Sequence, residues 1–211
     1  MNPGDAYTLL RVVDRGVILC DRHARRIAPH GGPVLDAFAA FARTAAPGIY
    51  AIHACAEGIR VEPRAQSRLA DGMPVRFLVS PHASLIGRFP KPAPPCAYDS
   101  VRSAGIATIL TSIDGREVIE ACSAAVVGWN GRELIFPPAD RPAVDSVTEQ
   151  ELRAAFPSIE APLLLEETLP IALINGVKGV CTLELPGRGE FPETVRLLIE
   201  SVLQRSARRP R

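Results

Sequence analysis

The sequence predicts an α+β protein of two lobes, a small N-terminal α/β lobe and a larger C-terminal lobe of mixed strands and helices. Short apolar runs separated by turn residues predict β-hairpins, and a few amphipathic helical patterns lie between them. A proline-rich stretch at 86–97 divides the chain, and such a segment is expected to be extended and semi-rigid. The predicted lobes therefore cover 1–85 and 98–211, and 211 residues are enough to bury a core.

The first lobe is predicted from turn and periodicity signals. β-Branched residues flank an Asp-Arg-Gly turn in the first hairpin and the Glu57-Gly58 turn in the second. A helix with apolar residues at helical spacing stops before Pro47. In order, the elements are a hairpin over 8–20, a short helix or turn at 21–27, a helix over 33–45, a hairpin over 48–64 and a strand within 73–82.

The second lobe begins with two hairpins, whose turns are Asp114-Gly115 and Asn130-Gly131. A helix follows at 146–157, capped by Ser146 or Thr148 ahead of an acidic first turn. Apolar segments over 161–185 and an amphipathic helix over 192–207 complete the lobe, and we expect the basic tail after it to be a frayed, solvated end.

Composition excludes several classes of function. A net charge of +1 argues against nucleic acid or an anionic membrane as partner, and no apolar run approaches the roughly 18–20 residues of a membrane span. Five scattered cysteines predict neither disulfides nor a zinc site, and the four histidines lack metal-ligand spacing. His53 lies in an alternating strand and is interpreted as structural. With no signal peptide in its first residues, we expect a cytoplasmic protein without a metal.

Lysine is rare in this chain. Only Lys91 and Lys178 occur, although arginines are plentiful. Lys91 lies in the stretch "GRFPKPAPPCAYDS" at 87–100, among four prolines. It is either a solvated loop residue or the amine on which the chemistry depends.

The segment "SIDGREVIEACSAAVVGWNGRELIFPPADRPAVDSVTEQEL" at 112–152 resembles the class IV aminotransferases. These are the fold-type-IV pyridoxal-phosphate enzymes, which include branched-chain and D-amino-acid aminotransferases and 4-amino-4-deoxychorismate lyase. The segments "LINGVKGV" and "GDAYTLLRVVDRGVILCDRHARRI" resemble further family motifs in both lobes. The residues in register with the central pattern are Asp114, Gly115, Val118, Glu120, Pro137, Pro138, Val147 and Thr148.

This resemblance implies a D-amino-acid aminotransferase-like fold with a barrel-like C-terminal lobe. It implies pyridoxal 5'-phosphate as cofactor, a transamination or lyase reaction on a small amino compound, and a homodimer. The short chain and the loop around Lys178 are more similar to the aminodeoxychorismate lyase branch.

The resemblance also implies roles for the cofactor-binding residues. Glu120 matches the glutamate that bonds the pyridine nitrogen, which strengthens the ring as an electron sink. Arg26 matches the arginine that binds the cofactor phosphate, although Arg22 and Arg25 are close rivals. The turn at 146–148 (Ser146, Val147 and Thr148) matches an anion site at a helix N-terminus.

By the same resemblance, Lys91 forms the Schiff base and moves the proton at the substrate. Tyr98 matches a tyrosine that contacts the 3′-oxygen of the cofactor, and Lys178 lies near the substrate.

The segment around Lys91 departs from the family pattern. The interval from Lys91 to Glu120 is short, and an ungapped match puts Gly87 or Ile86 at the lysine position. Prolines also prevent the usual helix after the lysine. Elsewhere Ala125, Glu149 and Gly176 replace an asparagine, an arginine and a residue whose hydroxyl often helps to hold the phosphate. The alternative hypothesis is therefore a non-catalytic homologue that binds a small ligand or a partner.

Overall fold

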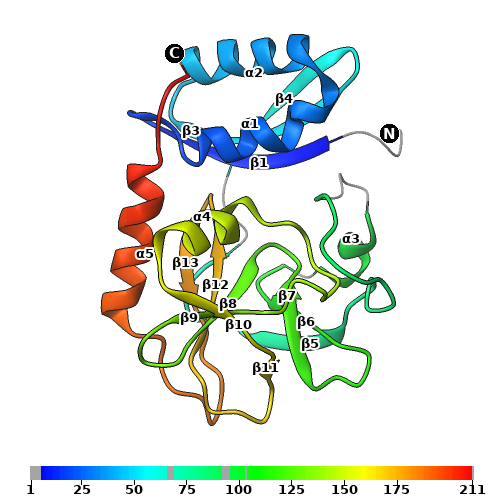
Figure 1. The fold of residues 1–211 in the computed structure, drawn as a ribbon, viewed down its shortest axis with the longest axis vertical. Coiled ribbons are helices and arrows are strands. Elements are labelled where there is room, and N and C mark those ends of the chain that lie inside the picture. Colours follow the sequence, from blue (N-terminus) through cyan, green and yellow to red (C-terminus); the bar gives the residue numbers. More distant parts are fainter. Residues whose placement is uncertain (1–5, 66–68, 92–95, 103, 211) are drawn as a thin grey trace.

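A computed structural model describes residues 6–65, 69–91, 96–102 and 104–210. Figure 1 shows a smaller lobe built from the N-terminal elements and a larger lobe that contains all later strands, with helix α5 (Glu193–Arg205) running along one side of the larger lobe toward the smaller one. The predicted mixed α+β architecture is confirmed. Within the described part of the chain, no helix combines the length and the apolar character needed to cross a membrane.

The smaller lobe is an antiparallel sheet covered by helices on one face (Figure 1). The sheet order is β2-β1-β3-β4, and the hairpins predicted at both ends of it are present. A core that includes Leu10, Phe38 and Ile52 fills the space between sheet and helices. The elements are β1 (Ala6–Val13), β2 (Gly16–Val17), α1 (Cys20–Ile27), the 3₁₀ helix η1 (Ala28–His30), α2 (Gly32–Thr44), β3 (Gly48–Cys55) and β4 (Gly58–Arg64).

The larger lobe has two sheets, with strand orders β10-β9-β8-β12-β13 and β11-β7-β6-β5. The strand pairing gives these two sheets separately, and it does not show the barrel-like closure that we expected. The strands are β5 (Val75–Val79), β6 (Ala107–Thr111), β7 (Glu117–Ala121), β8 (Ala125–Trp129), β9 (Leu134–Phe136), β10 (Ser158–Glu160), β11 (Leu163–Leu164), β12 (Ile171–Asn175) and β13 (Gly179–Thr182).

Strand β5 belongs to the sheet of the larger lobe, whereas the sequence analysis assigned its residues to the first lobe. It pairs in parallel with β6, from Val75 opposite Ala107 to Val79 opposite Thr111. The short helix α3 (Ala97–Val101) lies in the crossover between these two strands. A parallel partner is distant along the chain, so the local apolar pattern of 75–79 could not reveal which sheet it joins.

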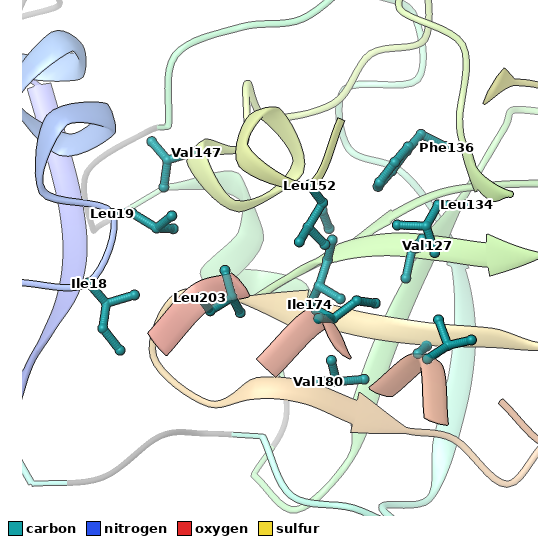
Figure 2. Packing of buried hydrophobic residues seen from close by; sticks show 14 of the residues in the cluster. Ile18, Leu19, Val127, Leu134, Phe136, Val147, Leu152, Ile174, Val180 and Leu203 are labelled. Carbon is teal, nitrogen blue, oxygen red and sulfur yellow. The ribbon is translucent and has the colours of Figure 1, made fainter. Parts of the chain in front are cut away.

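One hydrophobic cluster connects the lobes (Figure 2). Ile18 and Leu19 of the smaller lobe pack into the same cluster as Val147 of helix α4 (Val147–Ala155) and Leu203 of α5. Leu19 has a left-handed backbone, with a φ of 58°, and its N–H donates to Ser206 Oγ at 3.1 Å. This contact from the end of α5 helps to hold a conformation that a leucine rarely adopts.

The C-terminal tail is a structured connection between the lobes, which corrects the expectation of a frayed end. The backbone of Arg208 bonds that of Val17 in both directions, with N–O distances of 3.0 and 3.1 Å. Gly16 has a φ of +122°, and a Cβ there would lie 2.4 Å from the carbonyl of Arg208. The close approach of the tail therefore needs glycine at this position.

Candidate active site

A cavity of about 270 Å³ is lined by residues of both lobes. The smaller lobe contributes Tyr7, Leu9, Arg26 and Arg64, and the larger lobe contributes the rest of the lining. The volume lies just below the range of roughly 300–1,000 Å³ that is usual for small-molecule sites. The cavity therefore has the size for a small organic molecule.

Lys91 lines this cavity because its segment is fastened to the chain before α4. Phe89 forms a parallel bridge with Val144, in which Phe89 N–H donates to Ala143 O at 3.0 Å and Asp145 N–H donates to Phe89 O at 2.8 Å. Two residues later, Lys91 Nζ lies 5.4 Å from the centre of the Tyr7 ring. Residues 92–95, which hold three of the four prolines of the predicted connector, lie outside the described residues.

The Lys91 amine is in an environment that disfavours its charge. Burial lowers the pKa of Lys91 from 10.5 to about 7, and the positive charges of Arg26 and Arg102 contribute in the same direction. A large fraction of the amine is therefore neutral, and hence nucleophilic, near neutral pH.

Glu120 is 4% exposed and lines the same cavity from strand β7. Its Oε1 accepts the hydroxyl of Tyr98 on helix α3, and its Oε2 accepts the N–H of Val144 at 3.0 Å. Burial raises the pKa of Glu120 to about 7, although both hydrogen bonds act to lower it. Burial and the nearby Glu120 carboxylate also raise the pKa of Tyr98, so its phenol remains a donor.

Arg26 lines the cavity and is anchored close to the N-terminus of α4, where its guanidinium donates to Asp145 O. Burial lowers its pKa, with the nearby Asp145 acting against this. Of its two rivals, Arg22 pairs with Glu151 at 3.0 Å and Arg25 is exposed. Neither rival is among the described residues that line the cavity.

The turn at 146–148 lines the cavity beside this arginine. Ser146 is the N-cap of α4, since its Oγ accepts Glu149 N–H at 3.3 Å. The first N–H groups of a helix have no partner within the helix, and the helix dipole makes this end positive. Arg26 and the turn thus bring a guanidinium and the positive end of a helix to the same cavity.

Gly176 lies against the same turn. A Cβ on Gly176 would be 3.3 Å from Leu19 Cδ1 and 3.6 Å from Thr148 Oγ1. Asn175 shapes the loop, because its Oδ1 accepts the N–H groups of Val177 and Lys178 at 3.0 and 2.7 Å. Glycine therefore leaves room at the point where the sequence analysis noted the loss of a hydroxyl.

Glu149, which replaces a family arginine, is held by two other arginines. It is 5% exposed, and its Oε1 accepts Arg88 Nη2 at 3.0 Å and Arg153 Nη2 at 2.8 Å. Arg88 also donates to Pro137 O at 2.9 Å and lines the cavity. The carboxylate is thus paired, and a cation still faces the cavity from this side.

Arg102 and Arg64 are lining residues that the sequence analysis did not identify. Arg102 follows Tyr98 by four residues, about one helical turn, and this spacing could have indicated that both side chains lie on the same side of the segment. Its guanidinium donates to Asp99 and to Cys122 O. Arg64 ends strand β4, and nothing local in the sequence marks it as a cavity residue.

Lys178 points to a different environment. Its amine lies 3.4 Å from Asp71 Oδ2, and it is not among the described residues that line the cavity. A role for Lys178 in substrate binding stays a prediction.

His53 is 9% exposed and its ring lies against that of Tyr7. Among the described residues, no group of three or more His, Cys, Asp and Glu side chains could hold a metal ion.

The architecture of the chain as a whole defines a class of fold. Over nearly its whole length the chain has the fold of the fold-type IV aminotransferases and 4-amino-4-deoxychorismate lyases.

Three solved structures illustrate this likeness. The pyridoxal-phosphate-bound form of a hypothetical aminotransferase from Mycobacterium tuberculosis has a TM-score of 0.68 and 18% identity, over 98% of this chain and 95% of that one. The 4-amino-4-deoxychorismate lyase from Pseudomonas aeruginosa has a TM-score of 0.65 and 15% identity, over 95% and 90%. A fold IV transaminase from Curtobacterium pusillum has a TM-score of 0.62 and 14% identity, over 96% and 84%. No protein-family model matches the sequence, and no curated protein matches it.

Proposed function

We propose that this protein is a pyridoxal-phosphate-dependent enzyme, an aminotransferase or an aminodeoxychorismate-lyase-like enzyme, that acts on a small amino compound. One observation carries the proposal. The only amine of the described cavity lining, that of Lys91, shares the cavity with Glu120, Arg26 and the N-terminus of α4. An amine can bind an aldehyde, a carboxylate can bind a pyridine nitrogen, and a guanidinium beside a helix N-terminus can bind a phosphate.

The residues fit the cofactor by the chemistry of their donors. Pyridoxal phosphate supplies an aldehyde that amines bind and a ring that accepts electrons from the substrate α-carbon. Its phosphate would be held by Arg26 and the turn at 146–148, and the room beside Gly176 supports this. Its ring nitrogen would be held by Glu120.

Lys91 would serve as both nucleophile and proton carrier. A pKa of about 7 leaves the amine partly neutral at physiological pH, so it can attack a carbonyl carbon without prior help from a base. The same value suits an amine that takes and returns a proton near neutral pH.

Glu120 would act through its charge. In the cavity its pKa is about 7, and a positive group beside it would favour its ionised form. Tyr98 and the Val144 N–H orient the carboxylate, so its direction is set before a ligand binds. This preorganisation reduces the rearrangement that binding requires.

A homodimer belongs to the same proposal. Strand β5 is the edge of its sheet and exposes Phe77 and Val79, which are 38% and 50% accessible. Exposed apolar side chains on an edge strand favour association with another chain. Light scattering after size-exclusion chromatography gives the mass, and a monomer would remove this part of the proposal.

The test of the cofactor is a titration of the purified protein with pyridoxal phosphate, followed by absorbance and by borohydride reduction. We expect a new visible band, and a reduced label that peptide mapping locates on Lys91. Lys91→Met should abolish both signals. The chain has only one other lysine, so a label on Lys178 would refute the site assignment while keeping the cofactor. The absence of band and label would refute the proposal and favour a non-catalytic homologue.

A further inference from the structure

The Lys91 amine shares its cavity with the guanidinium groups of several arginines. Its nitrogen lies 5.4 Å from the centre of the Tyr7 ring. Arg26 and Arg102 both line the cavity, and their positive charges add to the effect of burial in lowering the pKa of Lys91. A partly buried lysine beside other cations is a setting in which an amine attacks carbonyl groups directly.

The reactive fraction of this amine is large. With a pKa of about 7, roughly half of the Lys91 amines are neutral at pH 7. An ordinary lysine with a pKa of about 10.4 is neutral in only about 0.04% of molecules at that pH. The difference in available nucleophile is on the order of a thousandfold.

The cavity also has a cation suited to a carboxylate. Arg102 Nη2 donates to Cys122 O at 3.1 Å and its Nη1 donates to Asp99, which orients the guanidinium. Its Nε is buried and has no hydrogen-bond partner among the described residues. A buried donor without a partner is unfavourable, and a carboxylate oxygen would satisfy it.

We propose that Lys91 also reacts directly, without any cofactor, with the carbonyl group of small 3-oxo acids whose carboxylate is drawn in by Arg102, and that the protein decarboxylates them. This activity differs from the proposed pyridoxal-phosphate chemistry, because the lysine and not a cofactor ring accepts the electrons.

The step balances without an oxidant or a reductant. The neutral Lys91 nitrogen attacks the 3-oxo carbon, and water leaves as the C=N bond forms. The bond to the carboxylate carbon then breaks, carbon dioxide leaves, and its electron pair moves to the nitrogen. A proton adds to the carbon that lost carbon dioxide, and water hydrolyses the C=N bond to give a ketone and free Lys91. Glu120, with a pKa of about 7, is a proton donor in the same cavity.

The test uses purified protein that has been freed of pyridoxal phosphate, with acetoacetate as the probe. Borohydride is added, and the reduced adduct is located by peptide mapping. We expect at least about tenfold more adduct on Lys91 than on Lys178, since the neutral amine is the nucleophile. Carbon dioxide release should fall at least about tenfold in Lys91→Arg, which keeps a cation and loses the nucleophile.

A pH profile tests the part of Arg102. Removing its charge in Arg102→Gln should raise the pKa of Lys91 and move the rise of adduct formation to higher pH. Arg132→Gln, a change at an exposed arginine on the β8–β9 turn, should leave the profile unchanged. If Arg102→Gln and the wild-type protein gave the same pH profile of adduct formation, the role of this arginine would be refuted.

No adduct on Lys91, or equal labelling of both lysines, would overturn the inference, and mapping of the wild-type protein gives this result even if the variants fold poorly. The two proposals fail separately. Binding of pyridoxal phosphate to Lys91 without any acetoacetate adduct refutes only the direct reaction. An adduct on Lys91 without cofactor binding refutes only the proposed function.

Discussion

Replacing Lys91 by methionine should stabilise the cofactor-free protein near neutral pH. Methionine has a similar length, fills the same space and carries no charge into the cavity. The wild-type amine must either be charged in an unfavourable environment or give up its proton on folding. Both routes lower the free energy of unfolding of the wild-type protein relative to the variant.

The size of the effect follows from the pKa of Lys91. A pKa lowered from 10.5 to about 7 corresponds to about 5 kcal/mol for a fully buried group. The side chain is only partly buried, so screening by water reduces this, and we expect about 2 kcal/mol. For a chain of this size, that is a rise in Tm of roughly 4–8 °C.

The lowered pKa of Lys91 also fixes the direction in which the free energy of unfolding changes with pH. Between pH 7 and 10.5 the unfolded state keeps the Lys91 proton that the folded state has released, so wild-type stability rises with pH in this window. Below about pH 7 both states are protonated, and the full penalty remains. The advantage of Lys91→Met should therefore be largest below pH 7 and shrink toward pH 10.

Urea unfolding of both proteins at several pH values measures this difference directly. Lys178→Met is the matched control, because it removes the other lysine of the chain, which pairs with Asp71. A difference between wild type and Lys91→Met that stays flat from pH 7 to 10 would refute the reasoning. It would mean that the amine is well solvated and that its nucleophilicity is ordinary.

Two further changes test how the site is supported. Glu149→Ala should lower the free energy of unfolding by about 3 kcal/mol, because Arg88 and Arg153 would lose a buried carboxylate that both contact; urea unfolding measures it. Gly16→Ala should lower Tm by several degrees, because its Cβ would lie 2.4 Å from the carbonyl of Arg208 and would push the tail away from the smaller lobe; thermal unfolding by circular dichroism measures it.

Each of these changes has a control elsewhere in the chain. Glu166→Ala breaks an exposed pair with Arg116 and should change stability by less than about 1 kcal/mol. Gly131→Ala also has a positive φ, of +97°, but its Cβ would meet open space. An effect of Glu149→Ala as small as that of Glu166→Ala, or of Gly16→Ala as small as that of Gly131→Ala, would contradict the packing described here.

Several elements of the site were predictable because their signals are local. The Asp114-Gly115 turn defined the hairpin that carries Glu120, and Ser146 marked the start of α4. The buried position of Glu120 and the cap at Ser146 agree with these signals. The two lysines also followed directly from composition.

Other elements depended on contacts between distant residues. The position of Lys91 in the fold could not be predicted from the sequence, because its interval to Glu120 departs from the family pattern. The parallel bridge between Phe89 and Val144 brings Lys91 into the cavity. Contacts between residues far apart in the sequence also decide the pairing of Arg88 with Glu149, the sheet to which β5 belongs and the attachment of the C-terminal tail to the smaller lobe.

By itself, the sequence indicated the main hairpins and the longer helices, and it determined the supply of reactive side chains. Turn residues, caps and apolar spacing act over a few residues, so they can be read along the chain. Only the tertiary structure decided that a lysine among prolines lines one cavity with Glu120, Arg26 and the start of α4. The reason is physical, because the burial and the neighbouring charges that lower the pKa of Lys91 come from segments far apart in the sequence.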